Sequence, residues 1–218
     1  MAHDVFDRTQ QESPGAELSA GTYNLIIGLV LLWGFGLNWA MVVMIPVESI
    51  LALNPLVFFG GYFALALGGV FLFRKSSNPV WSFVGYNMVA VPFGAIVNLA
   101  VSRYDPAVVI ETIQLTAAVT VVMMILGTLF PQFFARIAGA LSIALLIVIV
   151  IEVANIFIFK RDVAVIDWIV ALIFCGYIGY DWGRANRIPK TVDNAIDSAA
   201  SLYMDIINLF LRLLRRRR

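Results

Sequence analysis

Stretches of about twenty apolar residues alternate with short polar connections along nearly the whole chain. A helix needs about 20 mainly apolar residues to cross a bilayer core that is about 30 Å thick. The pattern therefore predicts seven membrane-spanning helices, at residues 23–44, 55–73, 80–100, 107–130, 133–157, 163–180 and 198–214.

Proline, asparagine and charged residues mark the connections, as in the segment 103–106 and at Pro131. Connections this short make successive helices antiparallel neighbours and leave no room for a soluble domain. We expect an all-α integral membrane protein, a seven-transmembrane-helix bundle over residues 23–214. A polar, acidic tail at 1–22 precedes it and a basic tail at 215–218 follows it.

Small residues gather in two of the predicted spans. Gly60, Gly61, Gly68 and Gly69 lie in the second span, and Gly139 lies between two alanines in the fifth. Small side chains allow helix backbones to approach closely in membranes. We expect ordinary close packing of helices at both places.

The last predicted span carries its main polar residues in one narrow stripe. Asp197, Ser201, Asp205, Asn208 and Arg212 recur at steps of three or four, which is the helical repeat. The opposite side is mostly apolar. A carboxylate in mid-helix is costly in so apolar a chain unless it faces a partner or water, so Asp205 is a candidate functional residue.

Composition narrows the classes of function. The chain is 61% hydrophobic and 13% charged, with a mean hydropathy of +0.89, which is far from globular usage. Cys175 is the one cysteine, which excludes a disulfide framework, and His3 is the sole histidine. Because this histidine lies in the polar tail, metal sites built on imidazole and catalytic Ser-His or Cys-His pairs are disfavoured. We expect no enzyme, no cofactor and no nucleic-acid partner.

Two other classes of intramembrane protein are also disfavoured. A retinal protein needs a lysine in its last helix, and no lysine lies within a predicted span. An aspartyl intramembrane protease needs its second aspartate in a Gly-x-Gly-Asp context, whereas Asp205 follows Leu-Tyr-Met.

Two aspartates are placed so that they could meet. Asp181 ends the sixth predicted span, and Asp205 lies two to three turns into the last one, which runs back beside it. Two carboxylates in a low-dielectric site cannot both ionise at little cost, so one would keep its proton and the pair would titrate as a unit. The pair is a candidate pH sensor and a candidate position for calcium, which prefers oxygen ligands. The alternative is a structural pair that only holds two helices in register.

The other carboxylates lie close to the ends of predicted spans. Glu111 is near the start of the fourth span, Glu152 near the end of the fifth and Asp167 near the start of the sixth. Their ordinary interpretation is a hydrated position at the membrane interface.

Basic residues do not decide the orientation. An amino terminus inside the cell puts seven Lys and Arg residues on the cytoplasmic side and eight on the other, and the arginine tail causes the near tie. Either the tail is exported, or the last stretch is re-entrant and returns it to the cytoplasm. A cytoplasmic tail could bind anionic lipid.

At these residues the chain resembles a known family. The run from Ser201 to Arg215, Ser-Leu-Tyr-Met-Asp-Ile-Ile-Asn-Leu-Phe-Leu-Arg-Leu-Leu-Arg, is similar to the carboxyl-terminal signature of the Bax inhibitor-1 family of membrane proteins. Tyr180 and Asp181 match the family's Tyr-Asp at the same place. Weaker matches are the Phe-Leu-Phe-Arg run that ends at Arg74, and Glu111.

The resemblance implies six helices around a central seventh and an aspartyl dyad of Asp181 and Asp205. It also implies a pH-sensitive calcium leak, with Arg74 as the latch that pairs with the dyad in a closed state. The family orientation puts the amino terminus in the cytoplasm, and the bacterial type implies the inner membrane.

Two hypotheses of function follow. In the first, the protein is a proton-gated cation leak pathway, with Ser201, Asp205 and Asn208 along the path and Glu111 in support. In the second, it is a membrane regulator without transport that binds a quality-control protease or a stress-pathway protein through its acidic tail. The expected partners are the lipid bilayer and the calcium ion, and a monomer is compatible with the short connections.

Overall fold

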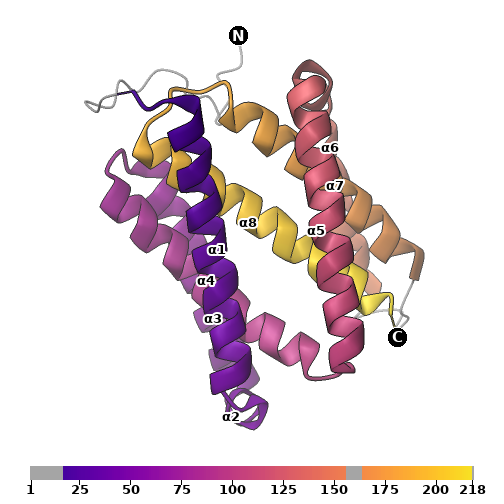
Figure 1. The fold of residues 1–218 in the computed structure, drawn as a ribbon. Coiled ribbons are helices and arrows are strands. Elements are labelled where there is room, and N and C mark those ends of the chain that lie inside the picture. Colours follow the sequence, from indigo (N-terminus) through magenta and orange to yellow (C-terminus); the bar gives the residue numbers. More distant parts are fainter. Residues whose placement is uncertain (1–16, 156–163, 218) are drawn as a thin grey trace. The chain divides into compact units, whose positions relative to one another are not determined.

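A computed structural model describes residues 17–155 and 164–217, and in this part of the chain only helices and connections occur, without a strand. The helices follow one another along the chain as shown in Figure 1. Their bounds are α1 Ala20–Met44, α2 Val47–Leu51, α3 Pro55–Lys75, α4 Pro79–Val101, α5 Pro106–Leu129, α6 Pro131–Ala154, α7 Ala164–Ala185 and α8 Val192–Arg215.

Proline begins four of these helices, α3, α4, α5 and α6. Proline suits the first turn of a helix because its backbone has no N–H to leave unpaired and its φ is already helical. Side chains cap several starts as well. Asn54 accepts a hydrogen bond from the backbone N–H of Leu56, and Asp105 accepts one from Ala107. The turn residues in the sequence therefore mark where the helices begin.

Six helices, α1 and α3 to α7, are long and apolar enough to cross a membrane. The class of all-α integral membrane protein is thereby confirmed. The last helix, α8, has 24 residues but is more polar and is not among the six, which were sought only within the described residues. The seven-helix count is therefore not confirmed, and a central place for the last helix stays a prediction.

Two boundaries differ from the prediction. Helix α7 continues for five residues past Tyr180, so that Asp181 lies inside the helix, because no proline occurs before Pro189. Helix α8 begins at Val192, six residues earlier than expected. The hydroxyl of Thr191 caps it by accepting a hydrogen bond from the N–H of Asn194 at 3.1 Å. The short helix α2 was not predicted. The acidic tail lies mostly outside the described residues.

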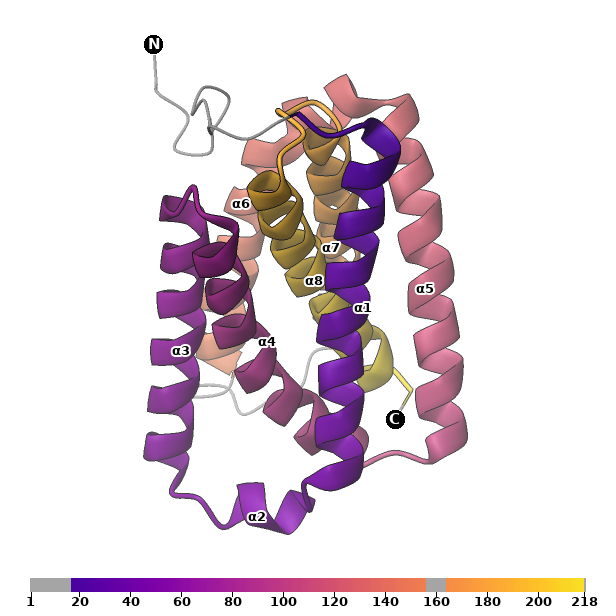
Figure 2. The same cartoon turned by 60° about the vertical axis from the view of Figure 1, so that its left-hand side comes forward.

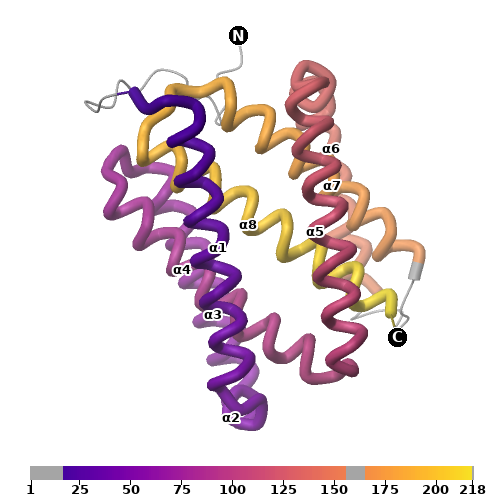
Figure 3. The backbone as a smooth tube through the Cα atoms, in the orientation of Figure 1, coloured from indigo at the N-terminus to yellow at the C-terminus, as the bar shows by residue number. Residues whose placement is uncertain are grey.

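The chain divides into two compact units. Unit 1 holds the described residues up to Asn98 together with 185–201, and unit 2 holds the remainder. Helix α8 is unbroken, as its continuous trace shows in Figure 3, and it contributes residues to both units.

In unit 1, α3 and α4 touch backbone to backbone. A Cβ atom on Gly69 would lie 2.5 Å from the carbonyl oxygen of Gly85, which is closer than real contacts allow. The predicted close approach is therefore confirmed at Gly69. It is wrong at Gly60, Gly61 and Gly139, where an added Cβ would meet no described atom within 4 Å.

Within unit 1 the start of α8 lies beside α1 and α4 (Figure 2), and buried polar contacts join it to both helices. The Tyr23 hydroxyl donates to the carbonyl oxygen of Asn194 at 3.2 Å and lies 3.1 Å from the Ser198 hydroxyl. The Ser82 hydroxyl donates to the carboxylate of Asp193 at 2.6 Å. These contacts satisfy polar groups of α8 that would otherwise be buried at a cost.

Replacing Ser82 with alanine is expected to lower the free energy of unfolding by about 2 kcal/mol, because a buried carboxylate loses a charge-assisted hydrogen bond. Both side chains are buried. Thermal unfolding in detergent measures the change. Ser102→Ala, at an exposed hydroxyl, is the control, and equal stability of the two variants would contradict the prediction.

Candidate functional site

The structure brings Asp181 of α7 and Asp205 of α8 together in unit 2. Their carboxyl groups are joined by a side-chain hydrogen bond. Asp205 is only 8% exposed, and its Oδ2 atom has no hydrogen-bond partner among the described residues. Asp181 is half-buried.

This hydrogen bond has a direct chemical meaning. An ionised carboxylate only accepts hydrogen bonds, so two carboxyl groups can bond to each other only when one of them carries a proton. The two carboxyl groups lie so close that a change in the charge of one acts directly on the other.

Glycines hold α7 in place around Asp181. A Cβ on Gly127 of α5 would lie 2.4 Å from the carbonyl oxygen of Gly179, and one on Gly183 would lie 2.9 Å from that of Gly127. On another side of α7, a Cβ on Gly179 would lie 2.5 Å from the ring of Phe134 in α6. Asp181 thus lies in a segment of α7 that packs closely on both α5 and α6.

The other predicted site residues lie at separate places. Ser201 is half-buried on the part of α8 that belongs to unit 1, and Arg74 is exposed in the last turn of α3, also in unit 1. In unit 2, the half-buried Asn208 donates to the carbonyl oxygen of Met204 at 2.7 Å. Glu111, with a side chain that is 60% exposed, pairs with Arg217 at 3.3 Å. Their roles as latch or pathway residues stay predictions.

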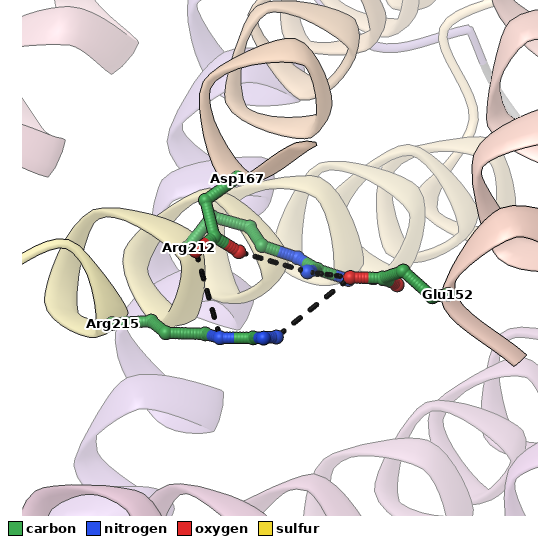
Figure 4. Close-up of polar contacts among 4 residues, drawn as sticks. All are labelled: Glu152, Asp167, Arg212 and Arg215. Carbon is green, nitrogen blue, oxygen red and sulfur yellow. Dashed lines mark hydrogen bonds and ion pairs between the residues drawn. The ribbon is translucent and has the colours of Figure 1, made fainter. Parts of the chain in front are cut away.

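A charged cluster in unit 2 was not predicted. Glu152 near the end of α6 and Asp167 near the start of α7 converge on two arginines at the end of α8, as Figure 4 shows. We call Glu152, Asp167, Arg212 and Arg215 the arginine–carboxylate cluster. The sequence did contain a signal, because antiparallel helices bring the end of α6, the start of α7 and the end of α8 to the same side.

The cluster is electrically balanced, with two positive and two negative groups. Arg212 binds Glu152 through both ends of its guanidinium, with one bond of 2.8 Å to Oε2, and binds Asp167 at 3.2 Å. Arg215 lies 3.7 Å from Glu152 and 3.5 Å from Asp167. The side chain of Asp167 is only 6% exposed, and both arginines contact its carboxylate.

The arginines that follow also contact unit 2. The guanidinium of Arg216 lies 5.4 Å from the ring centre of Trp168, in a cation–π contact, and Arg217 pairs with Glu111. The described arginines of the tail therefore have partners within the protein. The predicted contact of this tail with anionic lipid stays a prediction.

The two contacts between α7 and α8 also fix the direction of α8. Asp205 meets Asp181 near the end of α7, and Arg212 meets Asp167 near its start. Helix α8 thus runs antiparallel to α7 without a reversal between Val192 and Arg215. The two alternatives, an exported tail and a re-entrant last stretch, both stay predictions.

The acidic groups do not form a larger metal site. Among residues 17–155 and 164–217, no group of three or more His, Cys, Asp and Glu side chains is placed to hold a metal ion. Calcium takes six to eight oxygen ligands in stable protein sites. The aspartate pair alone would offer fewer.

Comparison with known proteins matches this chain to the family described as Inhibitor of apoptosis-promoting Bax1, over residues 17–216. An uncharacterized membrane protein of Vibrio cholerae is 31% identical over 143 residues, which are 65% of this chain and 63% of that protein. Protein LIFEGUARD 3 of Arabidopsis thaliana is 29% identical over 195 residues, which are 82% of this chain and 67% of the plant protein.

A viral relative is matched over a shorter segment. The Golgi anti-apoptotic protein of vaccinia virus is 33% identical over 117 residues, which are 53% of this chain and 48% of the viral protein. The family match, in contrast, extends from just before α1 to the last turn of α8, and it includes both aspartates. The chain therefore belongs to the Bax inhibitor-1 family of integral membrane proteins.

Proposed function

We propose that this protein is a pH-sensitive calcium leak pathway and that Asp181 and Asp205 form its proton-sensing element. The observation that supports the proposal is the hydrogen bond between their carboxyl groups, at a position where Asp205 is buried. Ionisable groups inside a membrane protein are costly and commonly mark ion or proton pathways.

The pair responds to pH through its charge. With its shared proton the pair carries one negative charge and joins α7 to α8. Loss of that proton leaves two adjacent carboxylates that repel each other and attract cations. We infer that this change in charge and in helix contact couples pH to cation flux, with calcium as the transported ion rather than a resident one. The latch role of Arg74 is part of the same proposal and comes from the family resemblance.

Calcium flux into dye-loaded proteoliposomes tests the proposal at mildly acidic and mildly alkaline pH. We expect wild-type flux to differ between the two conditions. In Asp181→Asn and in Asp205→Asn the ratio of the two fluxes should fall toward one, because an amide cannot exchange the proton. Asp105→Asn is the control, since Asp105 is an exposed helix cap that asparagine can replace.

A wild-type pH response in both aspartate variants would contradict the proposed sensor. Absence of calcium flux from the folded wild-type protein at either pH would contradict the leak pathway itself.

We further propose that the protein lies in a bacterial inner membrane with its amino terminus in the cytoplasm. Without the arginine tail, the distribution of Lys and Arg favours this orientation. Arg215, Arg216 and Arg217 have partners within unit 2. These contacts offer a reason why the tail need not follow the rule that Lys and Arg gather on the cytoplasmic side.

A second candidate function is a membrane regulator that binds a quality-control protease or a stress-pathway protein. It is favoured by the viral relative, which is named as a Golgi anti-apoptotic protein. In this case deletion of residues 2–20 should abolish the cellular phenotype, while Asp205→Asn leaves it intact. The opposite result favours the leak pathway.

A further inference from the structure

Helix α5 buries an unusual set of side chains. Its buried residues are Thr112, Thr116, Thr120 and Gly127, which lie on one face of the helix. Its large apolar residues point away from the protein, for example Ile113, Val121 and Ile125. A membrane helix that packs against a dry interior needs no hydroxyl groups there, so the polar inner face of α5 requires an explanation.

The hydrogen bonds of these threonines differ. Thr112 donates to the carbonyl oxygen of Val108 and Thr116 to that of Thr112, each at 2.7 Å. This bond to the residue four positions back satisfies a threonine within its own helix. Thr120 is as buried as Thr116 to within a few per cent, yet its hydroxyl has no partner among the described residues.

A buried hydroxyl without a partner costs about 1–3 kcal/mol. Buried polar groups are therefore nearly always bonded to protein or to ordered water. Thr112 and Thr116 bond to the carbonyl four residues back, but the Thr120 hydroxyl makes no such bond. A buried hydroxyl left in this way points to a partner that is not a protein atom.

Contacts between helices show which residues of α7 and α8 lie beside each part of α5 in unit 2. Gly127 touches Gly179 and Gly183, so it lies at the level of Asp181. Glu111 and Asp167, near the starts of α5 and α7, both pair with arginines at the end of α8. Helices α5 and α7 therefore run in the same direction, and α8 runs against both.

Thr120 precedes Gly127 by seven residues, or about 10 Å along the helix axis. It therefore lies about 10 Å from the level of the aspartate pair, toward the arginine–carboxylate cluster. On α8 this interval is occupied by Asn208, between Asp205 and Arg212. The face of α5 that carries Thr120 thus extends along the same part of unit 2 as the polar stripe of α8.

We propose that the Thr120 hydroxyl binds an internal water molecule and that the threonine face of α5 is one wall of a hydrated path in unit 2. The path leads from the aspartate pair toward the arginine–carboxylate cluster. A second buried oxygen without a protein partner, Oδ2 of Asp205, lies in the same unit and fits the same explanation. The role of this path in ion flux rests on the proposed leak pathway. Hydration of the α5 face is independent of that proposal.

Reaction of an introduced cysteine with Ag⁺ ions in water tests the hydration directly. In a Cys175→Ala background, Thr120→Cys is compared with Val121→Cys, whose position is 55% exposed on the outer, apolar face. A thiol reacts through its thiolate, which forms in water and not in lipid, so Thr120→Cys should react about tenfold faster or more. Equal or slower reaction at position 120 would show a dry interior and overturn the inference.

Two substitutions at the same position test the role in flux. Thr120→Val keeps the shape but removes the hydroxyl, and Thr120→Ser keeps the hydroxyl. We expect calcium flux to fall about fivefold or more in the valine variant, as loss of one hydrogen bond of about 1 kcal/mol implies, and to stay within about twofold in the serine variant. Equal flux in both variants would overturn the role of the hydroxyl.

The two proposals fail in different ways. If the wild-type protein carries no calcium, the leak pathway is wrong, but cysteine reactivity still decides whether the α5 face is hydrated. If flux is present and position 120 is unreactive, the pathway exists and runs elsewhere.

Discussion

Replacing Arg212 with alanine is expected to lower the free energy of unfolding by about 3 kcal/mol, because removal of one partner from a buried ion pair leaves the other charges uncompensated. Glu152 and Asp167 would then have Arg215 as their remaining partner in the cluster. Its guanidinium lies 3.7 Å from the Glu152 carboxylate and 3.5 Å from that of Asp167, further than the guanidinium of Arg212. The side chains of Arg212 and Glu152 are each 21% exposed, so water can relieve only part of this cost. Thermal or denaturant unfolding in detergent measures the change.

Arg217→Ala is the matched control, because it also removes an arginine near the end of α8 that is paired with a glutamate. The Arg217–Glu111 pair is largely exposed, and such pairs contribute less than about 1 kcal/mol. If Arg212→Ala and Arg217→Ala were equally stable, the cluster would have no structural role. The double variant Arg212→Gln, Glu152→Gln should recover part of the lost stability, since it leaves Asp167 and Arg215 as a balanced pair.

Replacing Gly127 with valine is expected to lower the free energy of unfolding by about 3 kcal/mol, since the added atoms overpack a contact between two backbones. A Cβ at this position would lie 2.4 Å from the carbonyl oxygen of Gly179. Backbone cannot move aside as a flexible side chain can, so α5 and α7 must separate. Their separation would also displace Asp181, and the pH response of flux should be reduced together with stability.

Gly139→Val is the control for the effect of valine in a helix. An added Cβ at Gly139 meets no described atom within 4 Å, so only intrinsic helix propensity changes, by less than about 1 kcal/mol. A Gly127→Val variant with the stability of Gly139→Val would show that α5 and α7 do not pack as described.

The sequence is sufficient to predict most of the membrane helices, because the information is local. An apolar stretch and a proline at its start each act within a few residues, as at Pro106 and Pro131. The start of α8 was missed because the cap at Thr191 is followed by Asp193 and Asp197, which look like a polar connection. The hydrogen bond of Asp193 to Ser82 makes that turn part of a buried helix.

The candidate site could be predicted only in part. The positions of Asp181 and Asp205 could be inferred because two consecutive helices are joined by a short connection. The contact of Gly127 with Gly179 depends on the rotation of α5 about its axis, which the sequence leaves open. In the same way, glycines in the second span look alike in the sequence, yet Gly69 packs on a backbone and Gly60 does not.

The buried threonines of α5 could have been identified from the sequence but were not predicted. Thr112, Thr116 and Thr120 follow one another at steps of four, as the polar residues of the last helix do. A stripe of hydroxyls in an apolar helix is less conspicuous than a stripe that contains carboxylates, because threonine can satisfy itself within the helix. Only the hydrogen bonds in the structure distinguish Thr120 from its neighbours.

The division of α8 between the two units bears on how the protein is made. Synthesis proceeds from the amino terminus, and domains generally fold as they emerge. The helices α1 to α4 enter the membrane first, but unit 1 also needs residues 185–201, which the ribosome delivers only after α5 and α6. Until then Ser82 has no Asp193 to bind, and the inserted helices form an unfinished assembly. The last helix is therefore the step at which both halves of the protein complete their folding, and a chain that stops before it should be a substrate for membrane quality control.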